Sequence, residues 1–135
     1  MIDSDIQVIR VREVMKTDFD LVDGKMTVAA ALETMKHVDT KSLIVDKRNV
    51  DDEYGMVLLS DIAKRVLGED RSPSRVNVYE VMSKPLLPID PEMDIRYCAR
   101  FLERFGLSRA PVIEDGKIIG IISFTDLVLK GLVKL

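Results

Sequence analysis

The sequence predicts an α+β fold made of two related halves, each with the element order β-α-β-β-α. The first observation behind this is an internal repeat, because residues 11–15 (VREVM) return as residues 78–82 (VYEVM). Second, the same patterns follow each copy: a short apolar stretch, a segment with helical spacing and two nearly pure apolar runs. Third, the polar segment 68–74 (GEDRSPS) separates the halves. Alone, a repeat of this size buries too little surface, which favours two copies packed together.

The first elements of each half can be placed in order. Short apolar stretches at 19–24 and 86–91 predict first strands, and helical spacing at 27–37 and 94–105 predicts first helices. Thr27 and Asp94 suit the starts of these helices, because their side-chain oxygens can accept from first-turn N–H groups that have no helical partner. Apolar runs at 42–46 and 110–114 predict the second strands.

The third strand of each half begins with glycine, at 55–59 and 120–124, and a polar pair then opens the last helix, Ser60-Asp61 and Thr125-Asp126. Residues 114–117 (EDGK) are typical of a tight hairpin turn. We therefore expect a first repeat at 8–68, a linker at 69–77 and a second repeat at 78–135. The two repeats are expected to pack through their sheets around a pseudo-twofold axis, with equivalent clefts between them.

Composition argues against several functional classes. Hydrophobic residues make up 47% of the chain and charged residues 32%, which is ordinary for a folded domain. The net charge of −3 gives the chain no general attraction to nucleic acid. No apolar run approaches the ~20 residues that span a bilayer, so we expect a cytoplasmic protein. Cys98 is expected to be buried in a helix and His37 to lie on a helix surface, and neither has partners for a metal site.

Taken in order, these motifs resemble the CBS-domain family, named for cystathionine β-synthase, whose tandem pair is called a Bateman module. The matching features are the Val-Met opening, the Ala-Pro-Val-Ile strand at 110–113 and a glycine-started strand followed by aspartate. They extend over nearly the whole chain, from Val11 to about Leu132. The resemblance implies a non-catalytic regulatory module. The sequence agrees, because it shows no nucleophile beside a base, no phosphate-binding loop and no dinucleotide fingerprint.

The resemblance also implies where an adenosyl ligand would bind. Members that bind such ligands carry glycine, two apolar residues, Ser or Thr, two variable residues and Asp, and residues 120–126 (GIISFTD) fit this pattern. It implies that Asp126 holds the ribose hydroxyls, with Ser123 or Thr125 near the sugar or phosphate. A carboxylate offers two acceptor oxygens for vicinal hydroxyls, and the adjacent helix start favours anions. The first half has Leu58 at the hydroxyl position, so only a weaker second site is expected there, at Asp61, Ser60 and Thr17.

Two further segments complete the implied site. Thr40-Lys41 and Ser108-Arg109 precede the second strands, and in nucleotide-binding relatives this stretch faces the phosphates from both halves. Two cations, each beside a hydroxyl, suit a polyanion. The segments 16–18 and 84–86 would lie beside the adenine, and Lys84 and Leu86 therefore join the main site.

Several interpretations remain open at this stage. From the residues alone, Asp61 and Asp126 could be helix-start residues after Ser60 and Thr125, and the cations could be ordinary solvated charges. The favoured function is binding of AMP, ADP, ATP or a related adenosyl ligand, with signalling to an effector that is not in this chain. The alternatives are a ligand-free dimerisation scaffold and an excised regulatory fragment of an enzyme or transporter. No cofactor or metal is expected.

We also expect a homodimer. The last helix of each half carries apolar side chains that a chain of 15.3 kDa has little room to cover. The side chains expected to form such an interface are Ile62, Val66, Leu67, Leu127, Val128 and Leu132.

Overall fold

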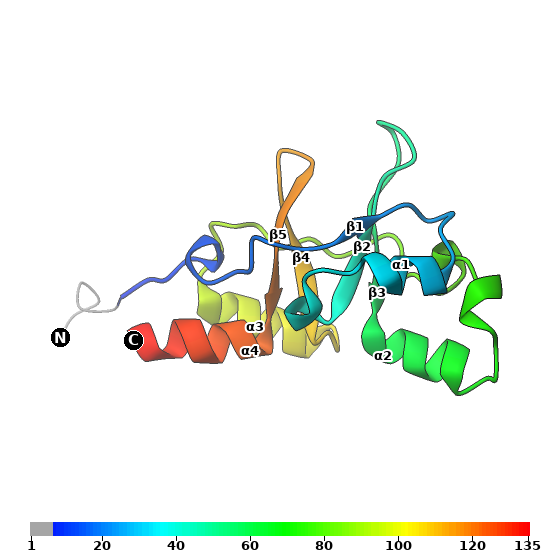
Figure 1. Ribbon diagram of the computed structural model, residues 1–135. Helices are drawn as coiled ribbons and strands as arrows, with labels where there is room; N and C mark the ends of the chain where they lie inside the picture. The colour runs from blue at the N-terminus through cyan, green and yellow to red at the C-terminus, as the bar shows by residue number, and fades with distance from the viewer. Residues whose placement is uncertain (1–6) are drawn as a thin grey trace. The chain divides into compact units, whose positions relative to one another are not determined.

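The computed structural model describes residues 7–135, which form two compact units (Figure 1). Unit A is the continuous stretch Asp18–Leu86, and unit B joins Leu87–Leu135 to the N-terminal segment that ends at Thr17. Both units contain helices and strands, so the predicted α+β class is confirmed. Each unit has its own buried cluster of mainly aliphatic side chains, as a chain with only 5% aromatic residues requires.

Unit A contains a three-stranded sheet in the order β1-β2-β3. Strand β1 (Leu21–Val22) runs parallel to β2 (Ser42–Val45), which runs antiparallel to β3 (Gly55–Leu58). Helix α1 (Val28–Thr34) connects the two parallel strands, and α2 (Leu59–Ile62) follows β3 directly and continues as a π-helical segment, Ala63–Leu67. Strand β2 is buried at every position, which explains why its sequence does not alternate between apolar and polar residues.

Helix α1 begins where predicted but ends earlier. Thr27 caps it, because Thr27 Oγ1 accepts a hydrogen bond from the backbone N–H of Ala30 at 3.1 Å. The prediction extended this helix to residue 37. Instead, the buried carboxylate of Asp20 accepts the backbone N–H groups of Lys36 and His37, each at 2.8 Å. These groups would otherwise continue the helical hydrogen bonds, so the helix stops before them and His37 does not lie on its surface.

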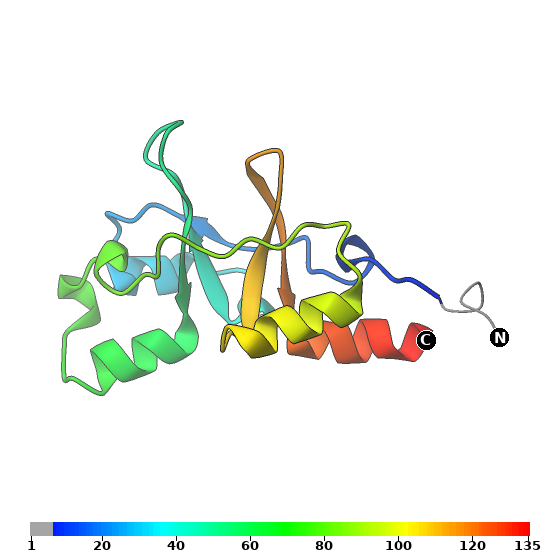
Figure 2. The same cartoon turned by 180° about the vertical axis from the view of Figure 1, so that it is seen from behind.

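Unit B contains the antiparallel hairpin of β4 (Arg109–Glu114) and β5 (Lys117–Ser123), which follows α3 (Ile95–Arg104). Helix α4 (Phe124–Asp126) begins directly after β5 and continues as a π-helical segment, Leu127–Gly131. This continuous helix lies alongside α3 (Figures 1 and 2). The strand predicted at 86–91 is reduced to one parallel bridge, between Ile89 and Val112.

The helix cap and the tight turn predicted for unit B are both present in the structure. Asp94 caps α3, since its Oδ1 accepts the backbone N–H of Arg96 at 2.8 Å. Between β4 and β5, Asp115 and Gly116 both have positive φ, 52° and 77°, as the predicted tight turn requires. Cys98 is fully buried in α3, and burial raises the pKa of its thiol to about 11.

The opening segment of each repeat packs with the other repeat. Lys16, in the first opening, forms an antiparallel bridge with Ile121 of β5, and Ser83, in the second opening, forms the same bridge with Met56 of β3. The N-terminal segment, blue in Figure 1, accordingly lies beside β5. The compact units therefore divide the chain differently from the sequence repeats, because the two openings are exchanged.

The glycine at the start of each third strand permits this exchange. A Cβ atom on Gly120 would lie 2.6 Å from the backbone oxygen of Lys16 and 2.8 Å from Met15 Sδ. A Cβ atom on Gly55 would lie 2.8 Å from Met82 Sδ. At Gly120 only glycine lets the exchanged backbone approach this closely, whereas at Gly55 the nearest atom belongs to a flexible side chain.

Candidate functional site

Asp126 lies at the junction of β5 and α4 in unit B, and its side chain is only 2% exposed. Its Oδ2 accepts two hydrogen bonds from Ser123, one from the hydroxyl at 2.9 Å and one from the backbone N–H at 3.2 Å. Ser123 Oγ in turn accepts the backbone N–H of Asp126 at 3.3 Å. This reciprocal cap fixes the orientation of the carboxylate and leaves Oδ1 to meet other groups.

Lys16 pairs with that second oxygen. Its ammonium group donates to Asp126 Oδ1 from a side chain that is 16% exposed. Lys130, one helical turn beyond Asp126, lies 3.8 Å from the same oxygen but is half exposed. A buried carboxylate without a partner would be strongly destabilising, so Lys16 is its main counterion. The sequence analysis placed the 16–18 segment beside a ligand but assigned no role to the Lys16 side chain.

Arg109 and Ser108 lie next to this pair. Arg109 is the first residue of β4 and lies opposite Ser123 in the sheet register. Burial lowers the pKa of the Arg109 guanidinium, and the negative charge of Asp126 opposes that effect. The backbone oxygen of Ser108 accepts the N–H of Phe124 at 3.3 Å, which ties the start of β4 to the start of α4. Of the predicted residues, unit B thus brings together Asp126, Ser123, Arg109 and Ser108, with Thr125 exposed on α4.

The counterpart in unit A is poorer in polar partners. Asp61 Oδ2 accepts the backbone N–H of Leu58 at 3.0 Å, but Leu58 has no hydroxyl to add a second hydrogen bond. The repeat places Ser83 where unit B has Lys16, so no ammonium group stands at the equivalent position. Ser60 is exposed on α2. The weaker second site expected at Asp61, Ser60 and Thr17 stays a prediction.

The Thr40-Lys41 pair has a structural role in unit A. Thr40 is 1% exposed, and its hydroxyl donates to the backbone oxygen of His37 at 2.9 Å. Lys41 adopts a left-handed backbone conformation with φ of 55°, and its carbonyl accepts the N–H of Leu59 at 3.0 Å. Its side chain is exposed. The pair therefore connects the start of β2 to the start of α2.

Two sequence-based groupings change because the openings are exchanged. The sequence analysis grouped Thr17 with Asp61, but Thr17 follows Lys16 and belongs to unit B with Asp126. It grouped Lys84 and Leu86 with the main site, whereas both belong to unit A. A sequence repeat does not reveal which third strand each opening will join, and this is why the groupings differ.

The groups that unit B brings together can accept hydrogen bonds and supply positive charge. Asp126 can accept hydrogen bonds from ligand hydroxyls, and Lys16 and Arg109 supply positive charge for an anionic group. Within residues 7–135, no cluster of three His, Cys, Asp or Glu side chains could hold a metal ion. In the same residues, no helix has the length and apolar character needed to cross a bilayer.

A model of the CBS domain matches the chain twice, over residues 11–68 and 78–131. The chain belongs to the CBS-domain family. Each matched segment begins with its own opening, at residues 11 and 78. The two CBS domains of the pair therefore exchange their opening segments.

Similar proteins confirm the CBS-pair fold. The hexameric CBS-CP12 protein from bloom-forming cyanobacteria is 35% identical, with a TM-score of 0.87 over 94% of this chain and 74% of that one. The uncharacterized protein MK0525 of Methanopyrus kandleri is 25% identical over 80% of this chain. The matched part makes up 56% of the length of MK0525. The CBS pair of protein MJ0100, in complex with 5′-methylthioadenosine and S-adenosyl-L-methionine, is 15% identical. Its TM-score is 0.79 over 96% of this chain and all of that one, which shows a common fold.

Proposed function

We propose that this CBS pair is a non-catalytic regulatory module that binds an adenosyl ligand at Asp126 and reports its presence to an effector. AMP, ADP, ATP and related adenosyl compounds are the candidates. The observation that carries the proposal is the buried Asp126 carboxylate, oriented by Ser123 and paired with Lys16. A protein with the same fold, MJ0100, binds two adenosyl compounds, and both of these contain a ribose ring.

The orientation of Asp126 suits a ribose. Ser123 occupies Oδ2 with two hydrogen bonds, so a ligand hydroxyl would reach the carboxylate on the Oδ1 side, where Lys16 now lies. Hydroxyl groups that donate to a buried carboxylate form charge-assisted hydrogen bonds, which are stronger than those between neutral groups. The ribose would replace the ammonium of Lys16 at this oxygen.

A displaced Lys16 needs a new anion, since its side chain is only 16% exposed. A phosphate on the same ligand would supply that anion. Arg109, which lies opposite Ser123 in the β4–β5 pairing, adds a second positive charge. Binding would thus exchange one ion pair for two favourable contacts, Asp126 with the ribose and Lys16 with the phosphate. We therefore expect phosphorylated adenosyl ligands to bind more tightly than adenosine.

A thermal-unfolding panel tests the proposal. We expect AMP, ADP, ATP or S-adenosylmethionine, at about 100 times its dissociation constant, to raise the free energy of unfolding by about 2.7 kcal/mol. GMP and CMP, which share the ribose and phosphate, are the controls for the base. If the chain responds to none of the adenosyl compounds, the proposal is wrong. Turnover of a bound nucleotide, followed by chromatography, would contradict the non-catalytic assignment.

Self-association is a second candidate role, and one observation favours it. The C-terminal part of unit B exposes large apolar side chains, with exposed fractions of 66% for Leu129, 59% for Leu132 and 76% for Val133. Apolar side chains this close together on one helical segment are typical of an interface. We propose that this segment forms a homodimer contact, and the two roles are compatible.

A further inference from the structure

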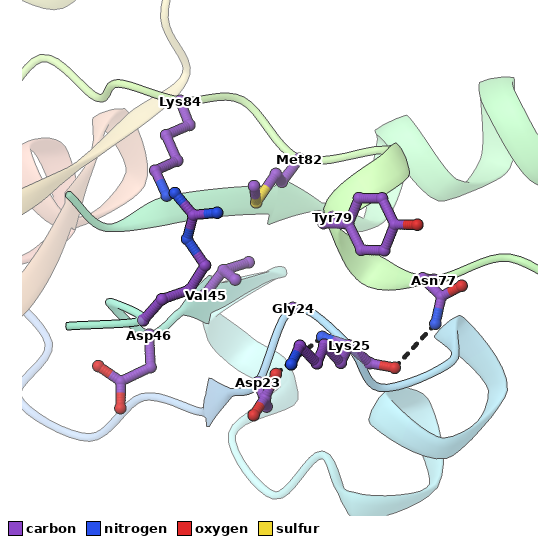
Figure 3. Close-up of a pocket in the computed structure, with 10 residues that line it drawn as sticks. Asp23, Gly24, Lys25, Val45, Asp46, Asn77, Tyr79, Met82 and Lys84 are labelled. Atoms are coloured by element: carbon purple, nitrogen blue, oxygen red, sulfur yellow. Dashed lines mark hydrogen bonds between the residues drawn. The ribbon is translucent and has the colours of Figure 1, made fainter. Parts of the chain in front are cut away.

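A pocket of about 850 Å³ opens in unit A, away from Asp61. It lies where β1 and β2 end, whereas Asp61 follows the far end of β3. Figure 3 shows Lys84 and Tyr79 on opposite sides of this pocket, with Met82 between them. Its volume is in the range that holds a small molecule.

The equivalent place in unit B is spanned by an ion-pair bridge. The internal repeat aligns Arg12 with Tyr79, Glu92 with Lys25 and Glu114 with Asp46. In unit B the Arg12 guanidinium contacts Glu92 at 3.3 Å and also pairs with Glu114. In unit A the arginine is replaced by a tyrosine and one carboxylate by a lysine, so this bridge cannot form.

One hydrogen bond to the backbone recurs at the two places. Arg10 Nη1 donates to the backbone oxygen of Glu92 at 2.9 Å, and the aligned Asn77 Nδ2 donates to that of Lys25 at 2.8 Å. The units share this contact but differ in side-chain chemistry and in the loop that follows, since residues 47–54 are three residues longer than residues 115–119. In unit B the region is closed by the ion pairs of Arg12 with Glu92 and Glu114, and unit A lacks these ion pairs.

Two cations are held in place at one side of the open pocket. Asp52, whose side chain is 8% exposed, pairs with Arg48 at 3.0 Å and with Lys84 at 2.6 Å. Hydrogen bonds from Arg48 and then Lys84 hold the pKa of Asp52 far below its usual range, so it stays charged. One carboxylate thus fixes two cations. The lining also includes Lys25 and the carboxylates of Asp23 and Asp46, which accept the backbone N–H groups of Lys25 and Lys47. Asp52 accepts hydrogen bonds from two of the five N–H groups of the Arg48 guanidinium, one on Nε and one on Nη2.

The remainder of the lining includes apolar surface and acceptors. Tyr79 is 54% exposed, and Met82 and Val45 form apolar wall beside its ring. Gly24 lies at the edge, where a Cβ atom would meet Val45 at 3.3 Å and narrow the pocket. An aromatic ring and a thioether are favourable neighbours for a flat ligand body.

We propose that this pocket binds a small organic anion with a planar apolar body, whose phosphate or carboxylate faces Arg48 and Lys84 and whose ring packs against Tyr79 and Met82. Every residue that lines this pocket belongs to unit A, whereas Asp126, Ser123 and Arg109 belong to unit B. Fixed cations recognise an anionic group without first having to be ordered, and the ring adds apolar contact.

Phenyl phosphate is the probe for this proposal, with inorganic phosphate and phenol as controls for the charge and the ring. Titration followed by two-dimensional ¹H–¹⁵N NMR should give saturable shifts at the amides of Gly24, Asp46 and Tyr79. Each control compound should bind at least about tenfold more weakly, because it makes only one of the two contacts.

The decisive variant combines Lys25→Glu with Tyr79→Arg, which rebuilds in unit A the bridge that Arg12 makes in unit B. We expect it to lower phenyl phosphate affinity at least about tenfold, since the new guanidinium would span the pocket. Arg48→Gln, which keeps a hydrogen-bond donor for Asp52 but removes the charge, should weaken binding. Arg104→Gln in unit B is the charge-matched control, and thermal unfolding of both variants checks that they are folded. The proposal would be overturned if the double variant or Arg48→Gln bound phenyl phosphate with unchanged affinity. It would also be overturned if the shifts were confined to other residues or did not saturate.

Discussion

At the scale of single residues, the Lys16–Asp126 pair explains how the Asp126 carboxylate can be buried. Asp126 is 2% exposed and Lys16 16% exposed, so water screens their interaction only weakly. The adjacent Lys130 is half exposed and 3.8 Å away, and it contributes less. The capping role of Asp126 and its proposed binding role are therefore compatible, because the cap uses Oδ2 and leaves Oδ1 to other groups.

Removing the counterion tests this pairing without any ligand. We expect Lys16→Met to lower the free energy of unfolding by about 3 kcal/mol, because it leaves a buried charge without its main partner. Adding Asp126→Asn to this variant should restore most of the loss, since no buried charge then remains. Lys130→Met is the matched control and should cost no more than about 0.5 kcal/mol. Urea unfolding measures all three, and equal costs for the two lysine variants would contradict the account.

At the scale of elements, the fold depends on where the two opening segments pack. Each runs antiparallel to the third strand of the other repeat, beside a glycine. The two glycines are not equivalent, however. The added Cβ would meet a backbone oxygen at 2.6 Å at Gly120, but mainly a flexible methionine side chain at Gly55.

Alanine substitutions should reveal that difference. We expect Gly120→Ala to destabilise the chain by about 1–3 kcal/mol, because the Lys16 backbone cannot move aside without breaking its bridge to Ile121. Gly55→Ala should cost clearly less, since Met82 can change rotamer. Equilibrium unfolding of both variants gives the comparison. A larger loss for Gly55→Ala would show that the close approach at Gly120 does not control stability.

Sequence patterns predicted the order and type of most elements, because local signals such as the caps Thr27 and Asp94 and the Asp115-Gly116 turn decide them. They failed where a distant side chain intervenes. Asp20 ends α1 by accepting two N–H groups from the segment after it, and nothing in the local periodicity indicates this.

The candidate site was predictable to the same extent. The motif at 120–126 identified Asp126 and Ser123, which the structure brings together. Lys16 was missed as a partner because its contact depends on the exchanged opening, a long-range pairing that a repeat in sequence does not specify.

At the scale of the whole molecule, the proposed self-association can be compared with the exposure of the predicted interface residues. Of the apolar residues predicted for a dimer contact, Val66 and Leu127 are 3% and 6% exposed and belong to the interiors of their own units. The others remain candidates, and Leu129 and Val133 are exposed on the same C-terminal segment. The CBS-CP12 protein, which is 35% identical to this chain, is hexameric.

We expect the chain to sediment as a dimer at tens of micromolar, because an apolar helical segment left in water favours burial. Leu129→Glu combined with Leu132→Glu should shift it to a monomer, since two charges cannot be buried unpaired at an interface. Val38→Glu with Val50→Glu is the control, because both valines are exposed in unit A, at 64% and 89%. A monomeric parent chain would rule out the homodimer.

The central claim, that Asp126 receives the ribose hydroxyls of an adenosyl ligand, is tested most directly by a ligand–protein double cycle. Calorimetry would compare AMP with 2′,3′-dideoxy-AMP on the parent chain and on Asp126→Asn, with Asp61→Asn as the matched control. The account predicts that losing the hydroxyls costs the parent chain and Asp61→Asn roughly ten- to a hundredfold in affinity, and costs Asp126→Asn much less. Equal losses in Asp126→Asn and the parent chain would show that this carboxylate does not bind the ribose.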